Sequence, residues 1–159
     1  MEITQRPIGE QDMDFLFHLY ASTREEELRP VPWTPDQKMA FLRQQFDAQH
    51  RHYQEYCAGA AFDLLLVDDR PAGRLYVSRG EKDIRIIDIA LMPEFRNRGI
   101  GTRLMTELFG EADGSGRLVS IHVEVNNPAR RWYDRLGFQG VSSEGVYLLM
   151  ERAPVATVA

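Results

Sequence analysis

A buried strand that runs into a loop and then an amphipathic helix is the feature that most limits how this chain can fold. The segment 84–92 is dense in β-branched and apolar side chains and stops at Pro93, which is typical of a buried strand. Apolar side chains then recur at helical spacing, at Ile100, Leu104 and Leu108, with Met105 and Phe109 beside them. The pattern predicts a strand-loop-helix unit that buries its strand and one face of its helix.

The loop between these elements, Arg96–Thr102, has the residues that an anion-binding turn needs. Gly99 and Gly101 let the backbone come close to a ligand, and the helix start contributes unpaired N–H groups and the positive end of its dipole. Phosphate is the natural occupant. The loop lacks the Gly-Lys-Ser/Thr of a P-loop and the third glycine of a dinucleotide-binding fingerprint. A phosphate cradle of another kind and a purely structural turn both stay open at this point.

The length of 159 residues fits a single domain with one core. We expect this domain to cover residues 2–152 and the small residues 153–159 to form a frayed tail. The single cysteine, Cys57, excludes an internal disulfide and a thiolate zinc cluster, in keeping with a reducing compartment. The first eight residues are polar, and no apolar run approaches the ~20 residues of a membrane span. We therefore expect a cytoplasmic protein with no membrane contact.

The charge of the chain is unevenly distributed. The formal net charge of −5 argues against general nucleic-acid binding. Between residues 96 and 135, however, there are seven arginines and only five acidic residues. This segment therefore has a formal net charge of +2 and the remainder of the chain one of −7. A local anion site within an acidic protein is consistent with this pattern.

Local patterns predict a mixed α/β architecture. The expected elements are a strand at 2–8, a helix at 9–28, a helix to about 56 capped by Thr34 and Pro35, strands at 61–67, 72–79 and 84–92, a helix from 100, a strand at 118–125, a helix at 127–136, and a hairpin of 138–141 and 146–151. This order predicts an α/β (α+β) fold with a mixed, mostly antiparallel sheet of six to seven strands, flanked by about four helices.

The element order and two motifs together resemble the GCN5-related N-acetyltransferase (GNAT) superfamily. The first motif is Arg96-x-x-Gly99-x-Gly101 between a strand and a helix. The second is Asn126-x-x-Ala129-x-x-x-Tyr133 followed by Leu-Gly-Phe, at the expected distance after the motif helix. The resemblance covers residues 2–152 and implies the GNAT fold, with two central strands that splay apart.

The resemblance implies that acetyl-CoA is the co-substrate and that no metal is required. Its diphosphate is expected on the backbone N–H groups of residues 98–102, with charge from Arg96 and Arg98. Its pantetheine arm is expected along the end of the strand at 84–92, which offers free backbone groups. The implied cofactor-binding residues are Leu91, Met92, Arg96, Arg98, Gly99, Ile100, Gly101, Thr102, Asn126, Asn127, Arg131 and Tyr133.

Amide formation from a thioester needs a free amine, stabilisation of the oxyanion and a hydrogen bond to the departing thiolate. The resemblance places a backbone N–H of Leu91 or Met92 on the acetyl oxygen and the phenol of Tyr133 on the sulfur. By spacing alone, Tyr133 is better explained as a core aromatic of its helix, and it is the resemblance that reverses this preference. Asn126 either caps a turn or bonds the pantetheine arm or a catalytic water.

The general base is less determined than the donor site. Strand alternation places His122, Glu124 and Asn126 on one face of their strand. Asp88 interrupts an otherwise apolar strand, where a carboxylate is costly unless it is paired or functional. Glu124 and Asp88 are the leading candidates for the catalytic base, followed by His122, with a water chain as the alternative.

The sequence leaves the acceptor open. We expect a small-molecule primary amine that attacks acetyl-CoA directly in a ternary complex, with no nucleic-acid partner. One alternative is a catalytically silent acyl-CoA-binding or sensing module. Another is a protein N-acetyltransferase acting on a lysine or an N-terminus. The sequence is also compatible with a homodimer.

Overall fold

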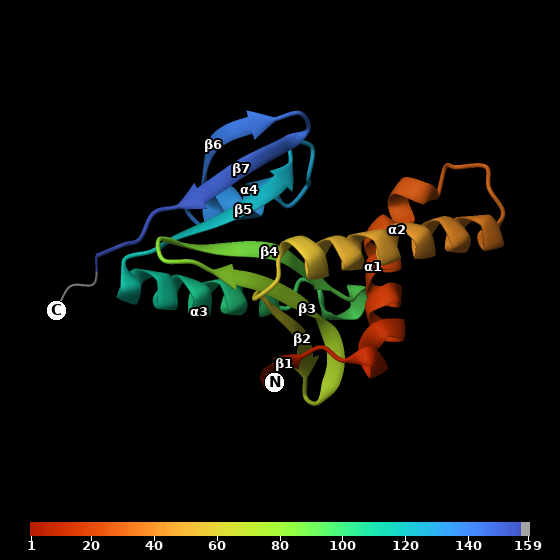
Figure 1. Cartoon of the computed structure of the whole chain (residues 1–159), viewed down its shortest axis with the longest axis horizontal. Helices are drawn as coiled ribbons and strands as arrows, with labels where there is room; N and C mark the ends of the chain where they lie inside the picture. Colours follow the sequence, from red (N-terminus) through yellow and green to blue (C-terminus); the bar gives the residue numbers. More distant parts are fainter. Residues whose placement is uncertain (157–159) are drawn as a thin grey trace. The chain divides into compact units, whose positions relative to one another are not determined.

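The computed structural model describes residues 1–156, which divide into two compact units. Unit 1 comprises Met1–Tyr76 and Asp88–Arg98, and unit 2 comprises Val77–Ile87 and the described residues from Gly99 onward. Figure 1 follows the chain through both units. No helix formed by residues 1–156 is long and apolar enough to cross a lipid bilayer.

Unit 1 contains two long helices and the first strands of the sheet. Its elements are β1 (Ile3–Pro7), the 3-10 helix η1 (Glu10–Asp12), α1 (Met13–Leu28), α2 (Pro35–Tyr56), β2 (Ala61–Val67) and the 3-10 helix η2 (Pro93–Phe95). β1 and β2 pair antiparallel from Ile3↔Val67 to Pro7↔Asp63. Thr34 caps α2 as predicted: its hydroxyl accepts a hydrogen bond from the Gln37 backbone N–H, and Pro35 fills the first helical position.

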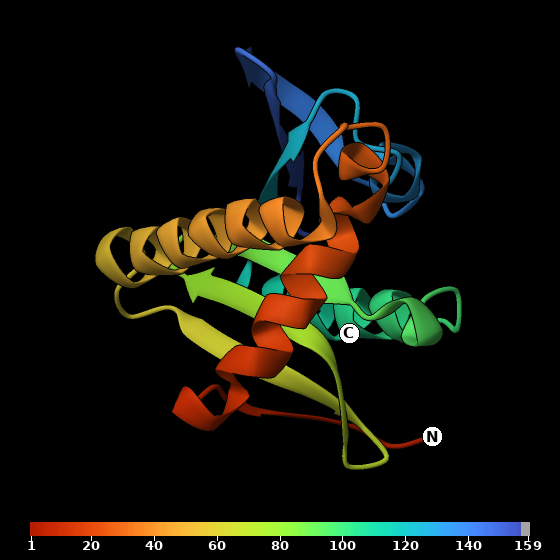
Figure 2. The same cartoon turned by 90° about the vertical axis from the view of Figure 1, so that its right-hand side faces the viewer.

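The core of unit 1 lies where α1 crosses α2 (Figure 2). Its buried members come from both helices and from β2: Leu16, Phe17, Leu19, Tyr20, Leu42, Phe46 and Leu64. The rings of Phe17 and Phe46 meet edge to face with centroids 5.8 Å apart. Ala90 and Met92, at the end of β4 (Asp83–Leu91) and just after it, pack against this cluster. The helix pair is thereby tied to the strand end that the sequence assigns to the donor.

Strands β3 (Arg70–Arg79) and β4 each begin in one unit and end in the other. The tight turn before β3 places Asp68 and Asp69 at φ values of 49° and 64°. Left-handed backbone at two successive residues matches the twist of a two-residue hairpin, and aspartate tolerates it. β3 therefore begins at Arg70, two residues earlier than predicted.

Unit 2 contains the motif helix and the C-terminal strands. Its elements are α3 (Ile100–Ser115), β5 (Leu118–Glu124), α4 (Arg130–Arg135), β6 (Gln139–Glu144) and β7 (Tyr147–Arg152). β5 pairs antiparallel with β7, which pairs antiparallel with β6. β4 and β5 run parallel and pair only from Asp83↔Leu118 to Ile86↔Ile121, although both strands continue.

The seven strands have the order β1-β2-β3-β4-β5-β7-β6. This mixed, mostly antiparallel sheet with four α-helices confirms the predicted fold class. Two of the boundaries that differ from the prediction have a clear local cause. α4 begins at Arg130 because the Asn127 side chain accepts a hydrogen bond from the Ala129 N–H and holds the preceding residues in a turn. β6 runs on to Glu144 because its pairing with β7 shifts register between Gly140 and Ser142 and then continues.

The tail predicted at 153–159 is described only to residue 156. Within that range, the Val155 N–H donates a hydrogen bond to Asp113 Oδ1 at 2.9 Å. Residues 157–159 of the predicted tail lie outside the described part of the chain.

Candidate functional site

Two residues of the Arg96–Thr102 segment adopt left-handed backbone conformations just before α3 begins. Asn97 has a φ of 60° and Gly99, the residue before the helix, has a φ of 80°. The first helical hydrogen bond runs from the Arg103 N–H to the Gly99 carbonyl at 3.0 Å. A helix leaves its first N–H groups without partners inside the helix, and its dipole makes this end positive. α3 therefore starts directly after Gly99, as the sequence predicts.

Arg96 lies against the end of β4. Its Nε donates to the Leu91 carbonyl at 2.9 Å, and its Nη2 donates to the Ser22 hydroxyl of α1 at 3.4 Å. The sequence predicted neither contact and assigned this guanidinium to the donor phosphate. In the structure its hydrogen bonds join the strand end to α1.

The backbone N–H of Met92 already has a hydrogen-bond acceptor within the protein. Its N–H donates to the Ala72 carbonyl at 2.8 Å. Next to this bond, a Cβ on Gly73 would lie only 2.2 Å from the Ala90 carbonyl oxygen, so β3 and β4 are in close backbone contact here. Two backbone N–H groups are predicted to bond the acetyl oxygen, those of Leu91 and Met92. Because the Met92 N–H already donates to the Ala72 carbonyl, Leu91 is the better candidate of the two.

Asp88 is paired. Arg74 of β3, with 4% of its surface exposed, donates to Asp88 Oδ2 and, at 2.8 Å, to Gln49 Oε1 of α2. The Tyr53 hydroxyl donates to the same Asp88 oxygen at 3.4 Å. Burial raises the pKa of Tyr53, and the negative charge of Asp88 raises it further. This pairing offsets the cost of a carboxylate in an otherwise apolar strand.

Arg74 is a residue that the sequence analysis missed. Burial lowers its pKa, but the charge and hydrogen bond of Asp88 together with the neighbouring Tyr76 and Tyr53 hydroxyls raise it by more, so the guanidinium stays charged. The sequence does contain a sign of this contact, because a basic residue lies inside one apolar strand and an acidic residue inside the neighbouring strand. Each buried charge is costly without a partner, so an ion pair between Arg74 and Asp88 could have been predicted.

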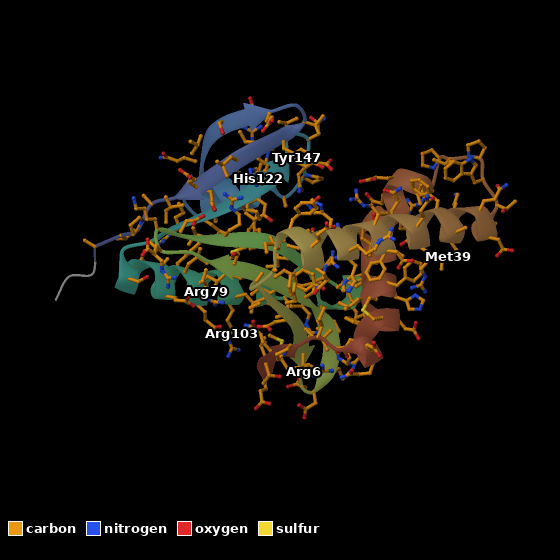
Figure 3. All side chains as sticks on the ribbon, viewed as in Figure 1. Arg6, Met39, Arg79, Arg103, His122 and Tyr147 are labelled. Atoms are coloured by element: carbon orange, nitrogen blue, oxygen red, sulfur yellow. The ribbon has the colours of Figure 1, made fainter. Side chains whose placement is uncertain are left out.

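In unit 2, the predicted face of β5 is formed. His122 and Glu124 are exposed while Ile121 and Val123 are buried, and Tyr147 of β7 lies directly opposite Glu124 (His122 and Tyr147 are labelled in Figure 3).

Arg85 of β4 donates to the ring of His122, with Nη1 3.1 Å from Nδ1. Arginine only donates hydrogen bonds, so Nδ1 accepts and the ring proton resides on Nε2. Burial lowers the pKa of His122, and the charge of Arg85 lowers it further, outweighing the opposite effect of Glu144. A neutral imidazole with its proton on Nε2 is a donor on that side and is poorly suited to accept another proton.

Helix α4 packs on the first turn of α3. A Cβ on Gly101 would lie 3.2 Å from the Trp132 ring, and the indole N–H of Trp132 donates to the Thr102 hydroxyl at 3.4 Å. Tyr133 is 5% exposed, and its ring meets Phe138 edge to face at 5.8 Å. The glycine end of the first motif and the helix of the second motif are thus neighbours in unit 2. Asn126 and Arg131 are exposed, and the Asn127 side chain holds the turn before the helix.

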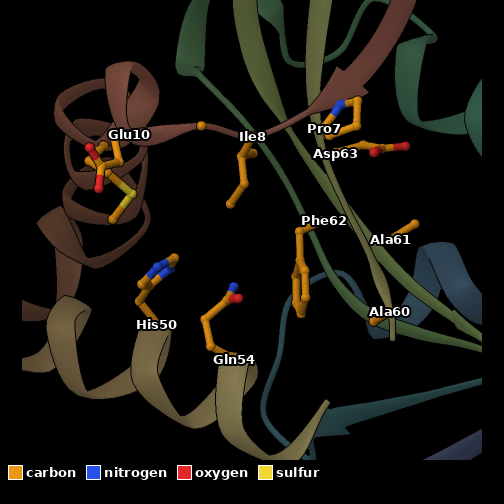
Figure 4. Close-up of a pocket in the computed structure, with 11 residues that line it drawn as sticks. Pro7, Ile8, Glu10, His50, Gln54, Ala60, Ala61, Phe62 and Asp63 are labelled. Carbon is orange, nitrogen blue, oxygen red and sulfur yellow. The ribbon is translucent and has the colours of Figure 1, made fainter. Parts of the chain in front are cut away.

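A hollow of about 470 Å³ lies elsewhere in unit 1 (Figure 4). His50 and Gln54 of α2 face Ile8 and Phe62 across it. None of the predicted site residues lines it. Among residues 1–156, no group of three histidine, cysteine, aspartate or glutamate side chains is placed to hold a metal ion.

A family model of the acetyltransferase (GNAT) family matches residues 16–138. This match covers well over half of the chain, and the chain belongs to that family, whose members are acyltransferases. The resemblance on which the sequence analysis relied is thereby confirmed.

Individual relatives agree with this membership. The chain is 28% identical over 133 residues to a Bacillus subtilis (strain 168) protein assigned as a ribosomal protein bS18-alanine N-acetyltransferase, covering 81% of this chain and 76% of the relative. The PaiA N-acetyltransferase of Thermoplasma acidophilum in complex with coenzyme A is similar with a TM-score of 0.71 and 16% identity, over 96% of this chain and 99% of the other. The Escherichia coli ribosomal-protein-S18-alanine N-acetyltransferase has a TM-score of 0.63 and 15% identity, over 99% and 97% of the two chains.

Proposed function

We propose that this protein transfers the acetyl group of acetyl-CoA to a primary amine by direct attack in a ternary complex. The observation that carries the proposal is the glycine turn at Gly99, which opens a 16-residue helix within a matched acetyltransferase sequence. The coenzyme A in the related T. acidophilum enzyme supports an acyl-CoA donor. In this proposal the N–H groups of residues 98–102 bind the diphosphate, and Asn126, Asn127 and Arg131 add polar contacts to the donor.

The proposed reaction assigns one task to each of three residues. The amine nitrogen attacks the thioester carbonyl, and the backbone N–H of Leu91 stabilises the oxygen that becomes negative. When the tetrahedral intermediate collapses, the carbon–sulfur bond breaks and the Tyr133 hydroxyl donates a hydrogen bond to the thiolate. The proton lost by the amine passes to a general base, for which we propose Glu124.

Glu124 is favoured because the other two candidates are engaged with arginines. Asp88 accepts from Arg74, and His122 accepts from Arg85, so a further proton on either group would weaken an existing contact. Glu124 has an exposed carboxylate on the same strand face as His122.

Steady-state kinetics test this assignment. Glu124→Gln should lower kcat/KM about 100-fold, since a positioned base contributes on this order. His122→Gln is the matched control on the same strand face and should lower kcat/KM far less. A loss of this size in folded Asp88→Asn, with Glu124→Gln close to the wild type, would show that Asp88 is the base instead.

Two acceptor classes fit the proposed reaction. A small-molecule amine is the acceptor expected from the sequence, whereas the B. subtilis relative, which matches 81% of this chain, favours the amino group of an alanine on a protein. Both acceptors present a primary amine to the same chemistry.

Thiol release from acetyl-CoA distinguishes these acceptors. The panel contains a peptide beginning with alanine, the same peptide with a blocked N-terminus, polyamines and free amino acids. Turnover with the free peptide and none with the blocked one supports the protein acceptor, and turnover with polyamines or amino acids supports the small-molecule acceptor. CoA binding without turnover on any amine would instead indicate a silent acyl-CoA-binding module.

A further inference from the structure

Two arginines of unit 1 contact one buried aromatic ring immediately before the glycine turn. Phe95 of η2 is 2% exposed. The guanidinium carbons of Arg70 and Arg98 lie 5.4 Å and 5.7 Å from its ring centroid. Arg98 belongs to the motif loop, whereas Arg70 is the first residue of β3. The β2–β3 hairpin thus brings a cation to the loop from a distant part of the sequence.

Neither arginine is neutralised by a neighbour. Among the ion pairs formed by residues 1–156, none includes Arg70 or Arg98, and both side chains are exposed. The nearby carboxylate of Asp68 accepts the Glu2 N–H at 2.8 Å. Arg96, the other cation of the loop, is turned toward the Leu91 carbonyl. The unpaired positive charge here belongs to Arg98 and Arg70.

We infer that Arg70 binds a phosphate group of the CoA donor together with Arg98. The inference rests on the proposed function, in which the Arg96–Thr102 loop holds that donor. Two cations held on one ring repel each other, and a phosphate between them removes the repulsion. The planar guanidinium matches the geometry of phosphate oxygens, and contact with an aromatic face restricts its motion before binding.

CoA has two kinds of phosphate that offer this chemistry, the diphosphate and the 3′-phosphate of its ribose. The inference is therefore tested with two ligands, CoA and 3′-dephospho-CoA, by isothermal titration calorimetry. The variants are Arg70→Ala, and Arg70→Met, which removes the charge but keeps an apolar cover over Phe95. Circular dichroism confirms that each variant is folded.

Arg43 provides a matched control in the same unit. Its guanidinium carbon lies 3.8 Å from the ring of Phe17, and it too is exposed and absent from the ion pairs of the described residues. Arg43→Ala thus removes an exposed cation from an aromatic ring elsewhere. We expect the Kd for CoA to rise about tenfold in both Arg70 variants and to stay unchanged in Arg43→Ala. The CoA affinity of the wild type should also fall more steeply with salt than that of Arg70→Met.

The second ligand identifies the phosphate. Equal affinities of wild type and Arg70→Met for 3′-dephospho-CoA, with a difference for CoA, identify the 3′-phosphate as the partner. A loss of affinity for both ligands identifies the diphosphate. The inference is overturned if the wild type binds CoA and the folded Arg70 variants bind it equally well. A wild type that does not bind CoA contradicts the proposed function itself, which separates the two failures.

Discussion

Replacing Gly73 with alanine should destabilise the protein strongly, because β3 and β4 leave no room for a side chain there. The new Cβ would lie 2.2 Å from the Ala90 carbonyl oxygen and 3.1 Å from the Leu91 Cα. Both neighbours are backbone atoms, so no rotamer change relieves the clash and the strands must separate. Overpacking of this kind costs about 1–3 kcal/mol, and losing the Met92 N–H to Ala72 hydrogen bond adds about 1 kcal/mol. We expect a loss of about 2–4 kcal/mol in the free energy of unfolding.

Gly110→Ala is the matched control for this prediction. Gly110 is an exposed residue in the interior of α3, and a Cβ there would have nothing within 4 Å. Both substitutions restrict the unfolded chain equally, so their difference isolates the clash. Thermal unfolding should show a melting temperature roughly 5–15 °C lower for Gly73→Ala and slightly higher for Gly110→Ala. Equal melting temperatures for the two variants would refute the close approach of β3 and β4.

Three further predictions concern the loop and the ion pairs. Gly99→Val should abolish CoA binding in a calorimetric titration and cost about 1–2 kcal/mol of stability, because a branched residue is strained at the observed φ of 80°. In urea unfolding, Arg74→Met and Asp88→Asn should each cost about 3–5 kcal/mol, and the double variant Arg74→Met/Asp88→Leu should cost less than either, because each single change leaves one charge unpaired. The hydrogen bond from Arg152 lowers the pKa of Asp113, so this carboxylate stabilises the folded state above its unfolded pKa. Stability should therefore fall as the pH drops below about 4, and less steeply in Asp113→Asn.

Local patterns predicted much of the fold because they depend on neighbours in sequence. The bounds of β2, the capped start of α2 at Thr34 and the start of α3 beside Gly99 all follow from short-range rules of alternation, capping and glycine placement. The exposed face with His122 and Glu124 follows from the same alternation.

The contacts that the sequence did not predict join distant segments. Arg70 reaches Phe95, and Arg96 reaches Ser22, only after the chain has folded, and no periodicity encodes such pairs. The sequence indicates that the carboxylate of Asp88 needs a partner or a function, but its partner Arg74 lies on another strand and no local pattern identifies it. The hydrogen bond from the Met92 N–H to the Ala72 carbonyl could not be predicted either, because any side chain is compatible with this backbone contact.

The division of the chain has a consequence for how the protein can be cut and synthesised. Residues 77–87 of unit 2 separate the two segments of unit 1, and residues 88–98 of unit 1 separate the two segments of unit 2. No single proteolytic cut can therefore separate the two units cleanly: a fragment that contains all of unit 1 must extend to residue 98 and carries residues 77–87 of unit 2 with it. During translation, the first 76 residues leave the ribosome without the strand end at 88–91 that packs on their helices. Deletion fragments should be designed around this interleaving of the two units.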